Sequence, residues 1–264
     1  QINIFVDMIL ASLLPVGAIS WLYYSDRITQ LPLGVIGIAI GTALLPHLSR
    51  LYANGEKLEM GKTLSDSLYL GSFFTLPATI ALLLLSPVII SGVFGYGAFD
   101  DADVNATASA LTAYAIGLPA FVAQKLFQCV FYASNRPLIV LRISLATVFG
   151  NIILSVILMQ FLGHIGLALA TSVAIWLGVL FQAHLLFRDD YLDIKSFLKL
   201  LPIILSCLGM GIVLKLLEGW LIVFQMLDIY LLIILVSTGL SIYFSLAFWI
   251  AFLPSGLIRN SFQK

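Results

Sequence analysis

The sequence predicts an all-α fold, a polytopic transmembrane helical bundle of about eight helices. Of the 264 residues, 61% are hydrophobic and 10% are charged, and the mean hydropathy is +1.09, well above the range of soluble domains. The apolar residues form continuous runs separated by short polar segments. Such runs indicate helices, because a transmembrane strand alternates polar and apolar residues, and because a helix satisfies its own backbone hydrogen bonds in lipid.

The expected helices follow one another along the chain. The first apolar run, 2–14, is shorter than the roughly 20 residues that a spanning helix needs, so we expect a truncated helix with residues missing upstream. The other expected helices are 18–48, 65–94, 106–133, 138–161, 164–187, 197–217 and 227–252. The segments between them are too short to form a soluble domain, so the function should lie within the membrane.

Lysine and arginine gather on one set of alternate connecting segments. The side of the membrane that these segments share would hold Arg50, Lys57, Lys62, Arg136, Arg142, Arg188, Lys195, Lys199, Arg259 and Lys264. The opposite side would hold Lys215 with the acidic residues Asp100, Asp101, Asp103, Glu218 and Asp228. The positive-inside rule therefore predicts that the first side and the C-terminus are cytoplasmic.

Several classes of function find no support in the sequence. Thirteen basic residues balance 13 acidic ones, so no positive excess indicates a nucleic-acid partner, and membrane lipids are the expected surroundings. The sequence lacks the metalloprotease, nucleophile-elbow, Walker A and dinucleotide-binding motifs. Cys129 and Cys207 lie in different apolar runs without C-x-x-C spacing, so we expect both to be packing residues.

Charged side chains inside the expected helices are the main candidates for function. A charge at the centre of a spanning helix costs roughly 2.5 to 3.5 kcal/mol on insertion scales, so it should face a partner or water. In WLYYSDRITQLPLG, Tyr24, Asp26 and Arg27 precede a helix break at Pro32. They could form the wall of a cavity for a phosphate, which a guanidinium binds with two parallel hydrogen bonds. Alternatively, Arg27 could lie at the outer interface of a long helix.

Lys125 is a second intramembrane cation. It lies about seven residues inside the expected cytoplasmic end of its helix, with Gln124 and Gln128 nearby and Pro119 before it. Its amine could extend along the helix to the cytoplasm. The alternative is that it shares a cavity with Arg27, so that an anionic headgroup could pass between the two cations.

Asp7, Asn151 and Thr171 are the remaining polar groups deep in expected helices. All three carry side-chain oxygens and have no neighbouring cation in the sequence. If they converge, they could form a sodium or proton site. Hydrogen bonding between helices is the alternative.

Prolines and small residues interrupt several helices. Pro32, Pro77 and Pro119 lie inside expected helices, where each removes a backbone hydrogen bond and kinks the helix. Such kinks suit a transporter that bends, although they could also be static. The small residues Gly34, Gly37 and Gly41 follow Pro32 at helical spacing, which favours close approach of another helix.

Two segments near the N-terminus, QINIFVDMILAS and GAISWLYYSDRITQLPLGVIGIAIGTALLPHLS, closely resemble the MurJ (MviN) family of lipid II flippases. FGYGAFD, KLFQCVFYASNRP and GHIGLALATSVA resemble the same family, whereas the last two helices resemble it weakly. The resemblance implies a two-lobe, MATE-like fold of the multidrug/oligosaccharidyl-lipid/polysaccharide (MOP) exporter superfamily. Residues 1–190 would be the C-lobe, with six helices of which the first is truncated, and 191–264 would add two terminal helices.

The resemblance also implies a function. The protein would be a transporter and not an enzyme, located in the bacterial inner membrane. Together with a missing N-terminal lobe, it would move lipid II, the undecaprenyl-pyrophosphate-linked disaccharide-pentapeptide, from the inner to the outer leaflet by alternating access. Arg27 and Asp26 match the family's cavity arginine and its neighbouring acid, and Lys125 matches a cavity lysine. Gln124, Gln128 and Tyr24 would complete the binding surface.

No cofactor is expected other than a candidate sodium ion. Asp7, Asn151, Thr171 and the carbonyl of Leu167 match a sodium site of the family. Ser155 stands where a second acid would be expected. The resemblance therefore leaves the ion dependence open.

Three other interpretations remain. The first is an exporter of another lipid-linked oligosaccharide or polysaccharide of the same superfamily, which the SDRITQLPLG segment argues against. The second is a membrane enzyme acting on a polyprenyl-linked sugar, which should show clustered carboxylates or a histidine in a sizeable loop. The third is a structural membrane protein, in which loss of Arg27 or Lys125 would be harmless.

Overall fold

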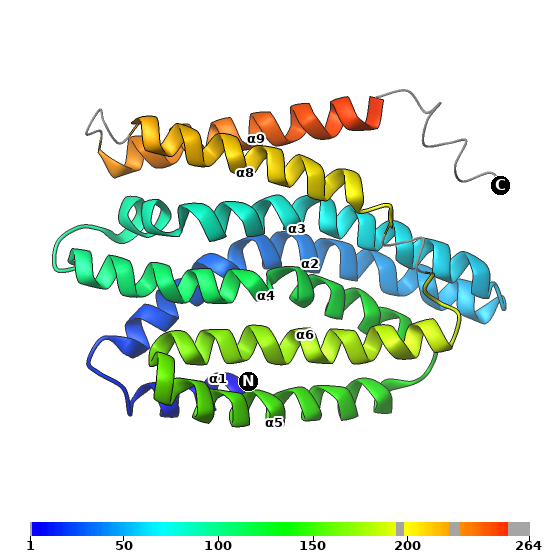
Figure 1. The fold of residues 1–264 in the computed structure, drawn as a ribbon. Helices are drawn as coiled ribbons and strands as arrows, with labels where there is room; N and C mark the ends of the chain where they lie inside the picture. Colours follow the sequence, from blue (N-terminus) through cyan, green and yellow to red (C-terminus); the bar gives the residue numbers. More distant parts are fainter. Residues whose placement is uncertain (1, 194–197, 222–226, 253–264) are drawn as a thin grey trace.

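The computed structural model describes residues 2–193, 198–221 and 227–252, and these residues form a bundle of roughly parallel long helices (Figure 1). The helices are α1 (Ile2–Ala11), α2 (Ala18–Ala53), α3 (Lys57–Phe94), α4 (Asp101–Ala133), α5 (Pro137–Leu162), α6 (His164–Arg188), α8 (Leu201–Leu221) and α9 (Asp228–Phe252). All except α1 are long and apolar enough to cross a membrane. The predicted all-helical fold is confirmed.

Helix α4 is the centre of the bundle, because it contacts α2, α3, α5 and α6. On one side of it, α6 packs against α5, and the short α1 lies against α5 (Figure 1). On the other side, α8 and α9 form an antiparallel pair that contacts α3 (Figure 1). Within the described residues, α3 is thus the main attachment of this pair to the bundle, and the predicted division near residue 190 stays a prediction.

Helices α3 and α4 begin several residues earlier than the sequence predicted. Helix α3 begins at Lys57 and not at residue 65, since charged residues can continue a helix beyond the lipid, and Lys62 there lies 3.7 Å from Glu59 one turn away. Helix α4 begins at Asp101 and not at residue 106. Its N-terminus is set by a capping box, in which the Asp100 carboxylate accepts from the backbone N–H of Asp103 at 2.9 Å.

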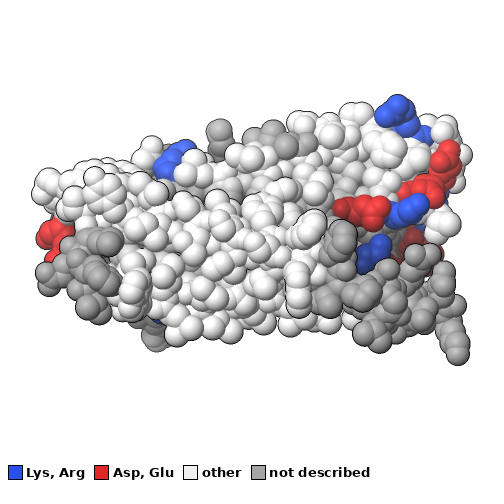
Figure 2. All heavy atoms as spheres, turned by 90° about the horizontal axis from the view of Figure 1, so that it is seen from above, with Lys and Arg blue, Asp and Glu red and all other residues white. Residues whose placement is uncertain are grey.

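Charged residues lie at the two ends of the bundle, with a broad uncharged band between them in the face that Figure 2 shows. One end contains the turns after α2 and α4 and the C-terminus of α6. The other end contains the α3–α4 connection with Asp100 and Asp101. It also contains an ion pair in α8, in which Nζ of Lys215 lies 2.7 Å from Oε2 of Glu218. Lys195, Arg259 and Lys264 of the predicted cytoplasmic set lie outside the described residues.

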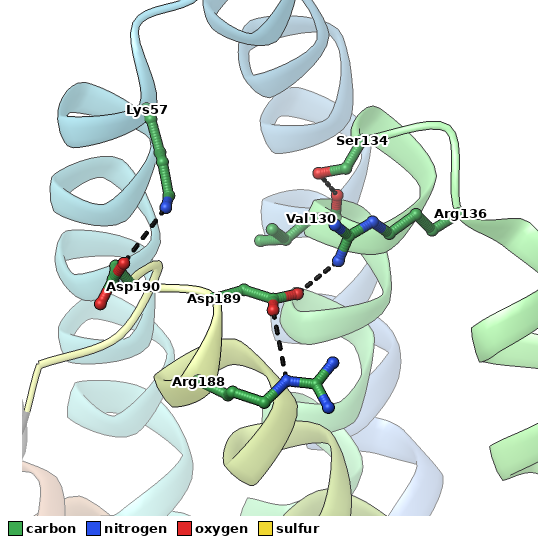
Figure 3. Close-up of polar contacts among 7 residues, drawn as sticks. All are labelled: Lys57, Val130, Ser134, Arg136, Arg188, Asp189 and Asp190. Atoms are coloured by element: carbon green, nitrogen blue, oxygen red, sulfur yellow. Dashed lines mark hydrogen bonds and ion pairs between the residues drawn. The ribbon is translucent and has the colours of Figure 1, made fainter.

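Ion pairs join three chain segments at the lysine- and arginine-rich end (Figure 3). Asp189, just after α6, accepts from Arg136 before α5 and lies 3.5 Å from Arg188. Asp190 lies 3.3 Å from Lys57 at the start of α3. Both partners of the Lys57–Asp190 pair are largely exposed, so this pair contributes little stability by itself. Together, the contacts join the segment after α6 to the starts of α3 and α5.

The prolines lie inside helices, as predicted for Pro32, Pro77 and Pro119, and Pro46 and Pro87 add two further cases. Pro77 cannot donate a hydrogen bond to the carbonyl of Phe73, four residues earlier. Instead, the buried Tyr243 of α9 donates its hydroxyl to this carbonyl at 2.5 Å. A side chain of the terminal pair therefore satisfies the backbone group that the proline leaves unpaired.

We expect Tyr243→Phe to weaken the attachment of α9 to α3 by about 1 kcal/mol, because a carbonyl then stays unpaired in an apolar surrounding. Thermal unfolding of the purified protein in detergent measures this effect. Tyr230→Phe is the matched control, since Tyr230 is an exposed tyrosine of the same helix. In a Pro77→Ala background, the new N–H can pair with Phe73, so Tyr243→Phe should cost less there. Equal costs in both backgrounds would contradict this account.

Candidate functional site

A cavity of about 490 Å³ opens between α1, α2, α4 and α6. It is lined by Asp7, Met8, Ala11, Ile19, Leu22, Tyr23, Asp26, Arg27, Thr29, Gln30, Leu33, Gly34, Tyr114, Phe121, Lys125 and Thr171. Two cations and two acids thus share one otherwise largely apolar cavity. This is the arrangement expected of charged groups that require water or a partner inside a membrane.

The packing of α2 determines which of its residues face this cavity. Ser25 is fully buried, and its hydroxyl lies 2.8 Å from the carbonyl of Thr107 in α4. Near the same end, the indole N–H of Trp21 donates to Asp103 of α4 at 2.7 Å. With this face held against α4, the face that carries Tyr23, Asp26, Arg27 and Gln30 is left toward the cavity.

Arg27 is exposed in the cavity and forms no ion pair within the described part of the chain. Its guanidinium lies 4.8 Å from the ring centre of Tyr23, a cation–π contact, and donates to the side-chain carbonyl of Gln30 at 3.2 Å. The Gln30 amide in turn donates to Asp26. Gln30 therefore bridges the adjacent acid and base, and most of the five guanidinium N–H donors remain available to a ligand.

Lys125 lines the same cavity from α4, so the structure brings the two predicted cations together. It is exposed to the cavity, and no ion pair involves it among the described residues. This placement favours the shared cavity over extension of the side chain to the cytoplasm. Gln124, its neighbour, instead lines a smaller cavity of about 180 Å³ between α4, α5 and α6, and Gln128 lines neither of these two cavities.

Tyr24 lies in an aromatic cluster outside the lining of the main cavity. Its ring centre is 4.7 Å from that of Phe94 and 5.8 Å from that of Phe99, at the junction between α3 and α4. The preceding residue, Tyr23, lines the cavity instead. A binding role for Tyr24 stays a prediction, but the geometry favours Tyr23 as the aromatic residue beside Arg27.

The sequence reasoning missed Tyr23 and Gln30 as site residues. The signal was present, because Gln30 follows Asp26 by four residues and Arg27 by three, the spacings that place side chains on one helical face. Tyr23 precedes Arg27 by four residues and lies on the same face for the same reason. Helical periodicity applied to the charged pair would have identified both.

The polar groups predicted to form an ion site are also brought together, by α1, α5 and α6. The Ser155 hydroxyl lies 3.5 Å from the Asp7 carboxylate and donates to the Asn151 side-chain carbonyl at 3.0 Å. The Asn151 amide donates to the Thr171 hydroxyl at 2.9 Å, which lies 3.2 Å from the Leu167 carbonyl. We refer to these five residues as the oxygen cluster. Asp7 and Thr171 also line the main cavity, so the cluster opens into it.

The composition of the oxygen cluster fits a monovalent hard cation. It offers one carboxylate, one amide oxygen, two hydroxyls and one backbone carbonyl, and oxygen ligands are those that hard cations prefer. One acid supplies a single negative charge, which matches a single positive one. Within the described ranges, no three His, Cys, Asp or Glu residues gather as a transition-metal site would require.

Comparison with known proteins places this chain in a family. The family model described as "Lipid II flippase MurJ" matches residues 1–235. The chain belongs to the MurJ family. A MurJ relative from Rickettsia prowazekii, described as "Probable lipid II flippase MurJ", is 34% identical over 258 residues, which are 94% of this chain and 50% of the relative. One from Rhizobium tropici is 34% identical over 273 residues, which cover 100% of this chain and 51% of the relative.

Solved structures agree with the family assignment. The structure "Lipid II flippase MurJ, inward closed conformation" has a TM-score of 0.80 and 30% identity, and covers 100% of this chain and 52% of that one. A MATE transporter in a bent conformation has a TM-score of 0.61 at 19% identity, which shows a shared fold. The chain spans about half the length of the MurJ relatives that it matches. Its apolar helices and its family make it a multi-pass membrane protein.

We expect the cavity of this MurJ-family chain to be hydrated. With Cys129 and Cys207 replaced by alanine, Arg27→Cys and Lys125→Cys should react with a charged, membrane-impermeant thiol reagent. Leu240→Cys, at an exposed apolar position of α9, should react at least roughly tenfold more slowly, because lipid disfavours the reactive thiolate. Labelling rates in intact vesicles measure the difference. Equal rates at all three positions would contradict a water-filled cavity.

Proposed function

We propose that this chain forms the second lobe of a two-lobe flippase that moves lipid II from the inner to the outer leaflet. The observation that carries the proposal is that Arg27 and Lys125 line the same cavity. Neither side chain has an ion-pair partner among the described residues. A pyrophosphate headgroup cannot cross hydrocarbon unaided, and fixed cations in an aqueous cleft lower the cost of its passage. The family name of the relatives supports the choice of substrate.

The two cations suit different stages of such a passage. Arg27 carries a planar fork that binds phosphate oxygens with two parallel hydrogen bonds, whereas Lys125 offers a compact charge on a flexible stem. The same family membership favours a transporter over an enzyme acting on a polyprenyl-linked sugar. Such an enzyme would need loop carboxylates for its chemistry, and the Asp189 carboxylate after α6 is instead engaged with Arg136 and Arg188 (Figure 3).

The orientation that we propose has the lysine- and arginine-rich end in the cytoplasm of a bacterial cell, with the C-terminus on the same side and the protein in the inner membrane. The positive-inside rule supports it. The structure places the α2–α3 and α4–α5 turns at one end of the bundle, as this orientation requires. A headgroup would then enter near Lys125 and leave near Arg27.

We further propose that the oxygen cluster binds sodium. Asp7 supplies the one negative charge, and the amide, hydroxyl and carbonyl oxygens of Asn151, Thr171, Ser155 and Leu167 would complete the ligands. Because Asp7 and Thr171 line the main cavity, an ion there lies next to the path of the headgroup. Asn151 and Ser155 are buried, so they hold the cluster in place.

The central test is Arg27→Ala in a two-lobe protein that includes this chain, expressed in bacteria depleted of their own flippase. We expect loss of growth and accumulation of lipid II in the inner leaflet, at normal levels of inserted protein. Loss of the charge-assisted hydrogen bonds should cost about 1.5 to 3 kcal/mol of binding, or roughly 10- to 150-fold in affinity.

The matched control is Lys62→Ala, which removes an exposed cation outside the cavity. It should support growth, because exposed ion pairs contribute little. Full growth with Arg27→Ala would instead identify Arg27 as an anchor at the membrane interface. Loss of growth with both variants would indicate a general effect of charge on insertion.

The sodium proposal predicts a salt-specific stabilisation. Sodium chloride should stabilise the two-lobe protein against thermal unfolding relative to potassium chloride at equal ionic strength, by about 2.7 kcal/mol at 100 times the dissociation constant. Asp7→Asn should abolish the difference between the two salts. Asp66→Asn, a surface acid 3.8 Å from Lys199, should leave it unchanged. A persistent difference in Asp7→Asn would exclude the oxygen cluster as the sodium site.

A further inference from the structure

Gly37 lies directly beneath the side chain of Lys125. A Cβ atom at Gly37 would lie 3.2 Å from Cδ and 3.7 Å from Cε of this lysine. Gly37 is buried, although it is on the α2 face toward which the cavity-lining residues Leu33 and Gly34 also project. The aliphatic stem of Lys125 therefore crosses the bare backbone of α2 at this position.

The neighbouring glycines do not share this contact. A Cβ at Gly34 or at Gly41 would meet no atom within 4 Å. The sequence predicted that all three glycines let another helix approach closely. The structure shows instead that Gly37 accommodates a side chain, while Gly34 and Gly41 face open space.

The position of Gly37 has a direct consequence for the lysine amine. Lysine has a four-carbon flexible stem, so its charge can occupy many positions unless the stem is held. Here the backbone of Gly37 and the side chain of Leu33 form a slot for the lysine stem. Cδ1 of Leu33 lies 3.5 Å from the position that a Cβ at residue 37 would take. Any side chain at residue 37 would occupy this slot and displace the stem. Loss of the slot would leave the α4 backbone in place and move only the charge.

We propose that Gly37 is a positioning residue that sets where the Lys125 amine stands on the path of the headgroup. This inference rests on the proposed function of the cavity. Ten residues separate Arg27 from Gly37, which corresponds to about 15 Å along the axis of α2. Helix α2 thus carries Arg27 and, through Gly37, fixes the position of the Lys125 amine relative to Arg27. A pyrophosphate would then meet two charges at defined depths in the membrane.

Gly37→Leu is the test, in the purified two-lobe protein with lipid II in detergent as the probe. We expect affinity to fall by about tenfold, close to the loss in Lys125→Ala. Gly37→Ala should cause a smaller loss, because a methyl group displaces the stem by only a few tenths of an ångström. Gly41→Leu is the matched control, since it adds the same side chain to the same helix at a position without a neighbour.

A double-mutant cycle separates positioning from general damage to α2. In a Lys125→Ala background, Gly37→Leu should have no further effect on lipid II affinity, because the side chain that it displaces is absent. An equal additional loss in that background would overturn the inference, as would full affinity in Gly37→Leu when Lys125→Ala is impaired. Unchanged affinity in Lys125→Ala itself would instead refute the proposed role of the cavity. Thermal unfolding of each variant confirms that it is folded.

Discussion

The contact between α2 and α4 is the constraint on which the cavity depends. Three contacts along α2 make it. The Trp21 indole donates to Asp103, the Ser25 hydroxyl lies beside the Thr107 carbonyl, and the Gly37 backbone lies against the Lys125 side chain. The first two fix the rotation of α2 about its axis, and this rotation decides which side chains face the cavity. The contact between Gly37 and Lys125 forms only because this rotation turns Gly37 toward α4. A helix turned by one residue, or about 100°, would lose the convergence of the two cations.

The fold was largely predictable because lipid allows few alternatives. Long apolar runs must be helical when no water satisfies the backbone, so each described spanning helix corresponds to a run in the sequence. The ends were less predictable. Hydropathy marks where a helix leaves the lipid and not where it ends, which is why the starts at Lys57 and Asp101 were missed. The capping box at Asp100 was visible in the sequence and would have corrected the second.

The site was predictable in its residue types but not in its geometry. The cost of charged and polar groups in lipid identified Arg27, Lys125 and most of the oxygen cluster from the sequence, and a resemblance to a known family added the carbonyl of Leu167. Whether residues of different helices meet depends on helix rotation and crossing, which local sequence does not encode. Gly37 illustrates this limit of sequence-based prediction. A glycine that packs against another helix and a glycine that packs against a lysine side chain look the same in sequence.

The hydrogen bond from Tyr243 to the carbonyl that Pro77 leaves unpaired links residues that are far apart in the chain. This bond has a consequence for which substitutions the protein tolerates at residues 77 and 243. The Tyr243 hydroxyl supplies a hydrogen bond that a proline at 77 cannot, so the proline is tolerated more easily while the tyrosine is present. The two positions should therefore be inherited together. A hybrid that takes its terminal helix pair from a relative without this tyrosine would leave the Phe73 carbonyl of α3 without this hydrogen-bond partner.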